Sequence, residues 1–571
     1  MADSSAIPRS DRRLDLVAAS AIVAIGLLYF AVRLPRGVDI TDEAYYVTHA
    51  VEWIRKGFAG STNLNIQQLS ALPTFPVVRL WMMWNGGLEG IILALRWTYA
   101  ALAVGTALAL YDFTRRIGPR SIAVPAGLLA IAFIPFGLPA PSYNTIAMLG
   151  SASALCLLGS ALLNASADAR LRSALLRLNL SALIWVVVGI CYPTLVIAPA
   201  MSAGVAFICI PHTRRLIITY MGLIAAWGVV GASVLLLVFG IDHLLSMLAY
   251  TSQSAQLGGR FTWKIDFVLE RLAAEPLATT AFAAMALIPL GLLRLEAARF
   301  VSSLSALFVI CFCCIMAAGP VAYIKSHDVI ILCFIFSLHC FSGLDARSSA
   351  IILVRVIVMS GLVCSMITAY TALYSIYNLA IGGFVSAAIG LASFAGRPVE
   401  RTTLWRIAPL ALCLATVGTL TMFRIYGEAT GYLSADAERV ESGPFLGLRT
   451  SPDLKAYIDT VSDEFAQHVS TNETVTVFGP VAGLYLLTDG IPHGISTWPA
   501  SRETGPEARA KWTAFLTKEP PDAIAYYADP WTKEPWPAEA SPLNNYGEVS
   551  RSTIGFRTFV LSRRVNTERK P

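Results

Sequence analysis

The sequence predicts a polytopic α-helical membrane protein of about thirteen spanning helices, followed by a C-terminal α/β domain outside the membrane. Of the 571 residues, 56% are hydrophobic and only 14% are charged, whereas about 25% of the residues in a soluble protein are charged. The mean hydropathy is +0.61. The apolar residues gather in long blocks that end near Phe423. We therefore divide the chain into a transmembrane region, 1–423, and a C-terminal domain, 424–571.

Each apolar block predicts a crossing helix, since about 20 apolar residues span the hydrocarbon core. The first block, Leu16–Leu34, lacks a good cleavage site and is expected to remain as the first helix. Two blocks meet at Cys191–Thr194 and form either two short crossings or one helix kinked at Pro193. The expected crossings centre near Ala24, Ala103, Leu128, Ala154, Val187, Ser202, Gly228, Met285, Val309, Ile335, Val363, Ala387 and Val417.

The arginines between the blocks set the expected orientation, because cytoplasmic loops are enriched in Lys and Arg. With the N-terminus inside, every cytoplasmic loop carries at least one arginine, and this holds beyond Cys191–Thr194 only if that region crosses twice. The C-terminal domain then lies outside. Arginine greatly outnumbers lysine, as in GC-rich bacterial genomes, so we expect a bacterial inner membrane with this domain in the periplasm.

The charge and the cysteines argue against two other kinds of site. The net charge is +6, but the chain has no long basic run with interleaved aromatics, so nucleic acid is not an expected partner. All ten cysteines lie in apolar segments, where cysteine behaves as a small apolar residue. A disulfide framework or a thiolate zinc site is therefore not expected.

The first outer loop, about 35–89, places two acids just beyond the membrane. Thr41 is the expected N-cap of a helix whose first turn holds Asp42 and Glu43. Acids at a helix N-terminus can simply stabilise the helix, by a few tenths of a kcal/mol each. One face of this helix carries an acid, two aromatic rings and an imidazole at helical spacing, namely Asp42, Tyr46, Trp53 and His49. A helix that is merely solvated would not need such a face.

The other outer segments carry the opposite charge. An amphipathic stretch, Leu72–Gly86, suits the membrane interface through its tryptophans and methionines. A carboxylate that deprotonates a hydroxyl, beside cations that hold a phosphate, suits chemistry on a lipid-linked phosphate. For Lys325 and His327 the alternative is snorkelling to the interface, and for Arg260 and Lys264 it is a mobile loop, as Gly258 and Gly259 suggest. The candidate phosphate-binding residues are Arg79, Arg260, Lys264, Lys325 and His327.

Polar and aromatic side chains of the outer segments are candidates for contact with a sugar or an acceptor. Each has a structural alternative: the Ser-Tyr-Asn sequence also makes ordinary turns, a tyrosine beside a proline often packs, and an interfacial histidine is often buried. The candidates are Tyr46, His49, Tyr143, Asn144 and Tyr192.

The tail reads as alternating helices and strands. We expect helices in "SPDLKAYIDTVSDEFAQHV" and "PEARAKWTAFLTK", and strands in "TVTVFG" and "AIAYYA". The tail has no nucleophile motif, phosphate loop or cluster of metal ligands. A lid or a recognition domain is therefore expected there rather than the catalytic centre.

Two stretches carry a resemblance to a known family. "DITDEAYYVTHAVEWIRKG" in the first outer loop and "GLYLLTDGIPHG" in the tail resemble the GT-C glycosyltransferases, in the branch of the protein O-mannosyltransferases and the lipid A aminoarabinose transferase. The resemblance implies that Asp42 acts as general base on an acceptor hydroxyl, with inversion at the anomeric carbon and departure of polyprenyl phosphate. It implies that Glu43 orients the acceptor or Asp42. A divalent metal ion, held by Asp42 and Glu43, stays open, and no other cofactor is expected. Asp39 is expected to be a loop or capping residue.

The sequence therefore favours a membrane glycosyltransferase. Its expected partners are a polyprenyl-phosphate sugar donor, a lipid, glycan or protein acceptor, and the bilayer. The alternatives are a transporter or flippase of lipid-linked glycans, a glycan polymerase or ligase, and a non-catalytic assembly protein. A transporter would place ionisable residues inside its spans, and this chain has few there.

Overall fold

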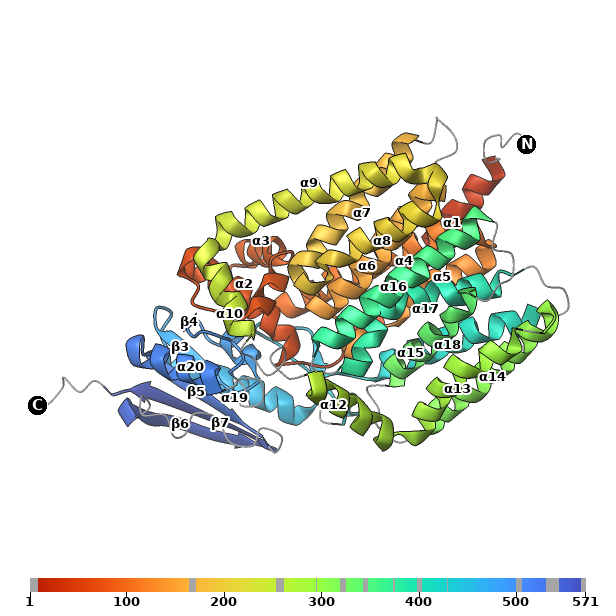
Figure 1. Cartoon of the computed structure of the whole chain (residues 1–571). Coiled ribbons are helices and arrows are strands. Elements are labelled where there is room, and N and C mark those ends of the chain that lie inside the picture. Colours follow the sequence, from red (N-terminus) through yellow and green to blue (C-terminus); the bar gives the residue numbers. More distant parts are fainter. Residues whose placement is uncertain are drawn as a thin grey trace, which may run out of the picture.

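The computed structural model describes residues 9–163, 171–252, 261–293, 295–318, 325–341, 348–372, 375–397, 403–428, 430–499, 506–529 and 544–565. It consists of a bundle of helices with a sheet domain packed against one end (Figure 1). The bundle contains α1 (Arg9–Arg33), α4 (Ile91–Ile117), α5 (Arg120–Ala132), α6 (Tyr143–Leu163), α7 (Leu171–Cys191), α8 (Ala198–Cys209), α9 (Arg214–Phe239), α13 (Pro276–Leu292), α14 (Ala297–Ala317), α15 (Lys325–Ser337), α16 (Ser349–Thr371), α17 (Leu379–Ala395) and α18 (Thr403–Phe423).

Every expected crossing centre lies in one of these helices. Within the described residues, nine helices are long and apolar enough to cross a membrane, or ten if the bent pair of α12 (Phe261–Ala274) and α13 is one span. The chain is thus a multi-pass membrane protein. Because α5, α8 and α15 are only 12 or 13 residues long, the count of thirteen crossings stays a prediction.

The region at Cys191–Thr194 separates two helices. α7 ends at Cys191, a 3-10 turn follows at Pro193–Ile197, and α8 begins at Ala198. Both α7 and α8 pack against α9, and the three lie side by side in Figure 1. The chain therefore forms two separate helices here, and the double crossing stays a prediction.

The arginine-rich ends of the helices gather at the end of the bundle remote from the sheet domain (Figure 1). There Asp15 of α1 pairs with Arg115 at 2.6 Å and with Arg120 at 2.7 Å. Asp112 pairs with Arg116 at 2.9 Å. The described ends of α1, α4 and α5, which the arginine pattern assigns to the cytoplasmic side, therefore lie at one end of the molecule.

The first outer loop packs between the bundle and the sheet domain (Figure 1). It contains α2 (Asp42–Lys56), two 3-10 turns (Phe58–Gly60 and Ile66–Ala71) and α3 (Phe75–Asn85). Most of α2 is buried. On α3 only Val78 is fully buried, and Arg79, Leu80, Met83 and Trp84 are exposed. An apolar exposed face at this end of the bundle fits the expected interfacial helix.

The C-terminal domain is an α/β sheet domain, as predicted. Its five strands run in the order β4-β3-β5-β7-β6, with β3 parallel to both neighbours and the other pairs antiparallel. A separate ladder joins β1 and β2. The elements are β1 (Glu438–Arg439), β2 (Arg449–Thr450), α19 (Pro452–His468), β3 (Thr474–Phe478), η9 (Ala482–Leu486), β4 (Ile491–Pro492), α20 (Pro506–Lys518), β5 (Ala523–Ala528), β6 (Tyr546–Ile554) and β7 (Arg557–Arg564).

The two helices cover opposite faces of this sheet. Val475 and Val477 of β3 pack in one cluster with α19, whereas Phe478 packs with Trp512 of α20. Successive side chains of a strand point to opposite faces, which explains why β3 is buried on both sides. The two strands expected from the sequence, β3 and β5, are central in the sheet, and the β6–β7 hairpin was not among the expected elements.

The domain shares an apolar core with the first outer loop. Ala44 and Val47 of α2, Ile91 of α4 and Leu484 of η9 belong to one buried cluster. Backbone bonds add to it: the Gly483 N–H donates to the Ile40 carbonyl at 2.8 Å. A shared core of this kind supports α2, and the role of the domain as a lid or a recognition domain stays a prediction.

Candidate functional site

Three acids stand at the start of α2, and the first is the helix cap. Asp39 Oδ1 accepts the Thr41 N–H at 2.8 Å and the Thr41 hydroxyl at 2.5 Å, and Oδ2 accepts the Glu43 N–H at 2.7 Å. Thr41, the expected cap, makes no side-chain bond to the helix, because its hydroxyl is directed to Asp39. Burial and then the charge of Asp42 raise the pKa of Asp39 to about 7, although the hydrogen bonds act against this rise.

The Glu43 carboxylate is buried in an ion pair with Arg96 of α4. Arg96 Nε lies 2.7 Å from Oε1 and Nη2 lies 2.6 Å from Oε2. Arg96 also donates to the carbonyls of Leu34 at 2.5 Å and Gly37 at 2.9 Å. This bidentate pair ties the loop before α2 to the bundle. Glu43 therefore holds the first turn of α2 in position, with both carboxylate oxygens engaged.

Asp42 is the half-buried acid of the three. Tyr426, just after α18, donates its hydroxyl to Asp42 Oδ2. Tyr46 lies one turn further along α2; burial raises the pKa of Tyr46 well above its usual value, and the neighbouring Tyr143 and Asp42 add to the rise. Asp42 thus stands where α2, the start of α6 and the segment after α18 meet.

Aromatic and amide side chains from several helix ends meet at the start of α6, where Tyr143 neighbours Tyr46. The rings of Tyr143 and Tyr192 lie 5.7 Å apart between centroids. Asn378 Nδ2 donates to Asn144 Oδ1 at 3.2 Å. The structure therefore groups four of the five candidate contact residues, namely Tyr46, Tyr143, Asn144 and Tyr192.

His49, the fifth candidate, is a packed side chain. It is fully buried, with Nδ1 3.3 Å from Asn63 Nδ2 and Nε2 3.4 Å from Thr497 Oγ1. Burial lowers the pKa of His49 to about 3. The neutral imidazole of His49 therefore packs between the first outer loop and the sheet domain. This burial corrects the expectation that His49 contacts the sugar or the acceptor.

His327 does not fit its expected role as a cation. It is fully buried, and its Nε2 accepts the Phe136 N–H at 3.2 Å. A ring nitrogen that accepts an N–H carries no proton. The ring packs against Phe136 at 4.4 Å and Phe133 at 5.2 Å between centroids. His327 is therefore a neutral packing residue that holds the Pro135–Gly137 turn.

The remaining candidate cations are scattered. Lys325 Nζ donates to the Met316 carbonyl at 2.8 Å, at the end of α14. Arg79 is exposed on α3. Arg260 lies outside the described residues, and of Lys264 only the helical backbone is described. The described part of the chain thus does not gather these side chains around Asp42.

The turn beside His327 is strained. Phe136 has φ 55, a left-handed conformation that is rare for a residue with a bulky side chain. The turn is held by Arg33, whose Nη2 donates to the Gly137 carbonyl at 2.7 Å and whose Nε donates to the Thr421 carbonyl at 2.7 Å. Arg33 thereby joins the ends of α1 and α18 to the turn.

Arg33, Arg96 and Tyr426 are the residues of this site that sequence reasoning missed. For the arginines a signal was present, because an ionisable side chain in an apolar helix needs a buried partner. Arg96 stands six residues into α4, and its partner Glu43 is 53 residues earlier. Tyr426 is 384 residues from Asp42 and has no local signal.

The expected divalent ion finds no suitable set of ligands at the start of α2. Both Glu43 oxygens bind Arg96, and both Asp39 oxygens accept hydrogen bonds from the α2 turn. Across the residues that the structure describes, no group of three or more His, Cys, Asp or Glu side chains could hold a metal ion. The described residues thus show no metal site, and a divalent ion at Asp42 stays a prediction.

The fold is shared with an archaeal enzyme. The crystal structure of the Archaeoglobus fulgidus oligosaccharyltransferase in complex with Zn and sulfate matches with a TM-score of 0.50 and 12% identity, over 94% of this chain and 72% of that one. Two other crystal or complex structures of this enzyme each match with a TM-score of 0.48 and 11% identity. One is tethered with an acceptor peptide containing the NVT sequon, and the other is AglB in complex with an inhibitory peptide and a dolichol-phosphate. They cover 90% and 89% of this chain and 69% of theirs. No protein-family model and no curated protein sequence matches the chain.

Proposed function

We propose that this protein is a membrane glycosyltransferase that moves a sugar from a polyprenyl-phosphate-linked donor to an acceptor hydroxyl at the outer face of a bacterial inner membrane. The fold shared with an oligosaccharyltransferase supports the reaction class. The similarity does not separate an O-mannosyltransferase-like or aminoarabinose-transferase-like enzyme from one that transfers a larger glycan. The polyprenyl-phosphate sugar donor is therefore proposed from the acids at the start of α2 and the resemblance of that stretch.

The observation that carries the proposal is the difference between Asp42 and its two neighbours. Asp39 and Glu43 are buried and engaged in positioning α2, whereas Asp42 is half-buried. The ion pair with Arg96 and the cap by Asp39 hold the backbone, and the Tyr426 hydroxyl orients the carboxylate. Such support is what a preorganised general base requires.

In the proposed reaction, Asp42 takes the proton of the acceptor hydroxyl as its oxygen attacks the anomeric carbon. The bond to the phosphate oxygen breaks, the configuration inverts and polyprenyl phosphate leaves. Because the leaving group is already activated, positioning and proton transfer are the protein's main tasks. We propose that Tyr46, Tyr143, Asn144 and Tyr192 line the path of the sugar or acceptor.

A transporter or flippase of lipid-linked glycans, or a glycan polymerase, is the second candidate. The buried arginines of the spans would mark a transport path only if they faced it. Arg33 and Arg96 instead donate to backbone carbonyls at the helix ends and to Glu43. This use of the two charges favours the transferase.

The test is turnover by purified protein in lipid vesicles, with polyprenyl-phosphate sugars and lipid-linked oligosaccharides as donors and lipid, glycan and peptide acceptors. We expect Asp42→Asn to lower release of the polyprenyl carrier at least about 100-fold, the contribution of a positioned base. Asp489→Asn, at a carboxylate whose side chain is 84% exposed, is the matched control and should retain turnover. Equal turnover by folded Asp42→Asn and wild type would reduce Asp42 to a helix-terminus charge and overturn the mechanism.

A further inference from the structure

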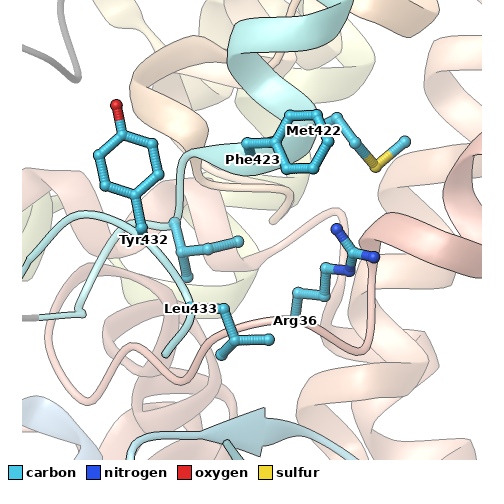
Figure 2. A pocket seen from close by; sticks show the side chains of 6 residues that line it. Arg36, Met422, Phe423, Tyr432 and Leu433 are labelled. Atoms are coloured by element: carbon cyan, nitrogen blue, oxygen red, sulfur yellow. The ribbon is translucent and has the colours of Figure 1, made fainter. Parts of the chain in front are cut away.

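A surface cavity of about 270 Å³ lies where the last spanning helix meets the C-terminal domain. It is lined by Arg36, Met422, Phe423, Ile425, Tyr432 and Leu433. Figure 2 shows Arg36 extending from the loop after α1 toward Met422 and Phe423 at the end of α18, with Tyr432 and Leu433 along the other side. The cavity therefore joins one cation to apolar walls.

A second cation stands beside this cavity. The Arg424 side chain is 8% exposed, and its Nη2 donates to the Tyr432 hydroxyl at 3.1 Å. Its Nε and Nη1 are buried without a hydrogen-bond partner among the described residues. The Arg36 guanidinium likewise forms no ion pair or hydrogen bond within the described part of the chain. A buried positive charge is costly, and a nearby anion lowers this cost.

Strand pairing places two more arginines, Arg449 and Arg439, alongside Arg36. Arg36 is bridged to Arg449, and Arg449 is paired with Arg439 across the β1–β2 ladder. Residues paired across strands project from the same face, and like charges placed opposite one another are destabilising. Within the described residues the nearest acids in sequence form no ion pair with these arginines: Glu438 faces Lys455 at 3.8 Å, and Glu428 accepts the Thr450 hydroxyl at 2.5 Å.

The cavity also lies at the expected membrane surface. Met422 and Phe423 are the last residues of α18, and Phe423 is 57% exposed. Tyr432, with an apolar ring and a polar hydroxyl, is 44% exposed, as is typical of an interfacial residue. A ligand here would meet arginine donors at one end and hydrocarbon at the other.

We infer that this cavity binds the phosphate group of a lipid in the outer leaflet, with Arg36 as the phosphate ligand and Met422, Phe423 and Leu433 against the lipid chain. Arg424, bonded to Tyr432 of the cavity wall, would attract the phosphate by its charge without touching it. Arginine presents several N–H donors to a phosphate in a planar fork. Arg439 and Arg449 add positive charge beside the cavity. The inference depends on none of the steps assigned to Asp42, and a polyprenyl phosphate or a glycerophospholipid would supply the same chemistry.

The experiment is equilibrium binding to the full chain in neutral-detergent micelles, with three radiolabelled probes: a C55 polyprenyl phosphate, dioleoylphosphatidylglycerol and inorganic phosphate. We expect Arg36→Gln to weaken lipid binding about tenfold, as loss of a charge-assisted contact predicts. Arg36→Lys, which keeps the charge, should bind within about threefold of wild type. Arg551→Gln, at an exposed arginine paired with Glu548 on β6, is the matched control and should bind as wild type.

The three probes separate the sources. If Arg36→Gln weakens the binding of polyprenyl phosphate alone, the cavity is a site for the glycan carrier. If it weakens the binding of both lipids equally, the cavity is a general phospholipid site. Binding of inorganic phosphate alone, or lipid binding unchanged in folded Arg36→Gln and Arg424→Gln, overturns the inference. Arg36 is only half-buried, so this variant tests the inference even if Arg424→Gln unfolds, which thermal unfolding would reveal.

Discussion

At the scale of residues, the start of α2 shows how three similar carboxylates acquire different tasks. Asp39 accepts donors of its own turn, Glu43 is neutralised by Arg96, and Asp42 is half-buried against a tyrosine. Burial and partners make this division, since acids of one helical turn have nearly the same local sequence environment. Asp42 is the acid that we propose as the general base.

The first prediction concerns the pair of Glu43 and Arg96. Arg96→Met should be strongly destabilising, by about 3–5 kcal/mol, because it leaves a buried carboxylate unpaired. The double variant Glu43→Met/Arg96→Met should lose less than the sum of the single variants. Thermal unfolding in detergent of the four proteins measures the coupling. Additive losses would show that the ion pair does not join α2 to α4.

The second prediction concerns Glu52, which is buried on α2. Burial raises the pKa of Glu52 to about 7 from 4.5, although Lys56 and the Ser61 hydroxyl act against the rise. Between these values the folded protein keeps a proton that the unfolded chain has released. Stability should therefore fall as pH rises through this window, by up to about 1.4 kcal/mol per pH unit.

Glu52→Gln should remove this part of the pH dependence, because an amide does not titrate. The measurement is the apparent Tm between pH 4.5 and 8, with Glu89→Gln at an exposed carboxylate as control. A wild-type slope that survives unchanged in Glu52→Gln would assign the dependence to another group.

At the scale of elements, close backbone contacts set the position of α2. A Cβ at Gly483 would fall 2.7 Å from the Ile40 carbonyl oxygen, and a Cβ at Gly427 would fall 2.9 Å from Asp39 Cα. Glycine alone permits these approaches without displacement. The segments before α2, after α18 and at η9 are therefore in direct contact, although they lie far apart in the chain.

The third prediction uses two glycines that share a backbone conformation. Gly427 has φ +86 beside Asp39, whereas Gly431 has φ +71 with open space around it. Both alanine variants should lose about 1 kcal/mol to the left-handed backbone. Only Gly427→Ala should also displace the loop at Asp39 and lower turnover severalfold. The measurements are the turnover and the Tm of both variants. Equal turnover by Gly427→Ala and Gly431→Ala would exclude a role for the close contact between Gly427 and Asp39.

At the scale of the whole molecule, the two ends of the bundle differ in chemistry. One end carries the ion pairs of Asp15 and Asp112 with arginines. The other carries Asp42, the cavity at Arg36 and the sheet domain, which shares a core with the first outer loop (Figure 1). Sugar transfer and lipid binding are thus both proposed at the outer end.

The fourth prediction tests this orientation in spheroplasts with a membrane-impermeant maleimide. Lys518→Cys, with a side chain 82% exposed in the sheet domain, should be labelled directly. Arg172→Cys, at an exposed position at the start of α7, should be labelled only after permeabilisation. Wild type gives the background from the native cysteines. Protection of both positions would place the sheet domain and the arginine-rich end on one side and require an even number of crossings.

Much of the fold was predictable because its signals are local. Each crossing centre expected from hydropathy lies inside a helix of the structure. The period-2 and period-3.6 patterns likewise located β3, β5, α19 and α20. The first turn of α2 was likewise evident from its acids. The short helices α5, α8 and α15 leave the count of crossings open, since length alone does not distinguish a short span from a buried helix.

The sequence by itself determined a multi-pass helical protein, its α/β tail and the acids at the start of α2. Only the tertiary structure decided which residues do what there. It buried His49 and His327, paired Glu43 with Arg96, and joined Asp42 to Tyr426 across 384 positions. The physical reason is range: helical period and hydropathy depend on neighbours in the chain, whereas burial and hydrogen-bond partners depend on which distant segments pack together.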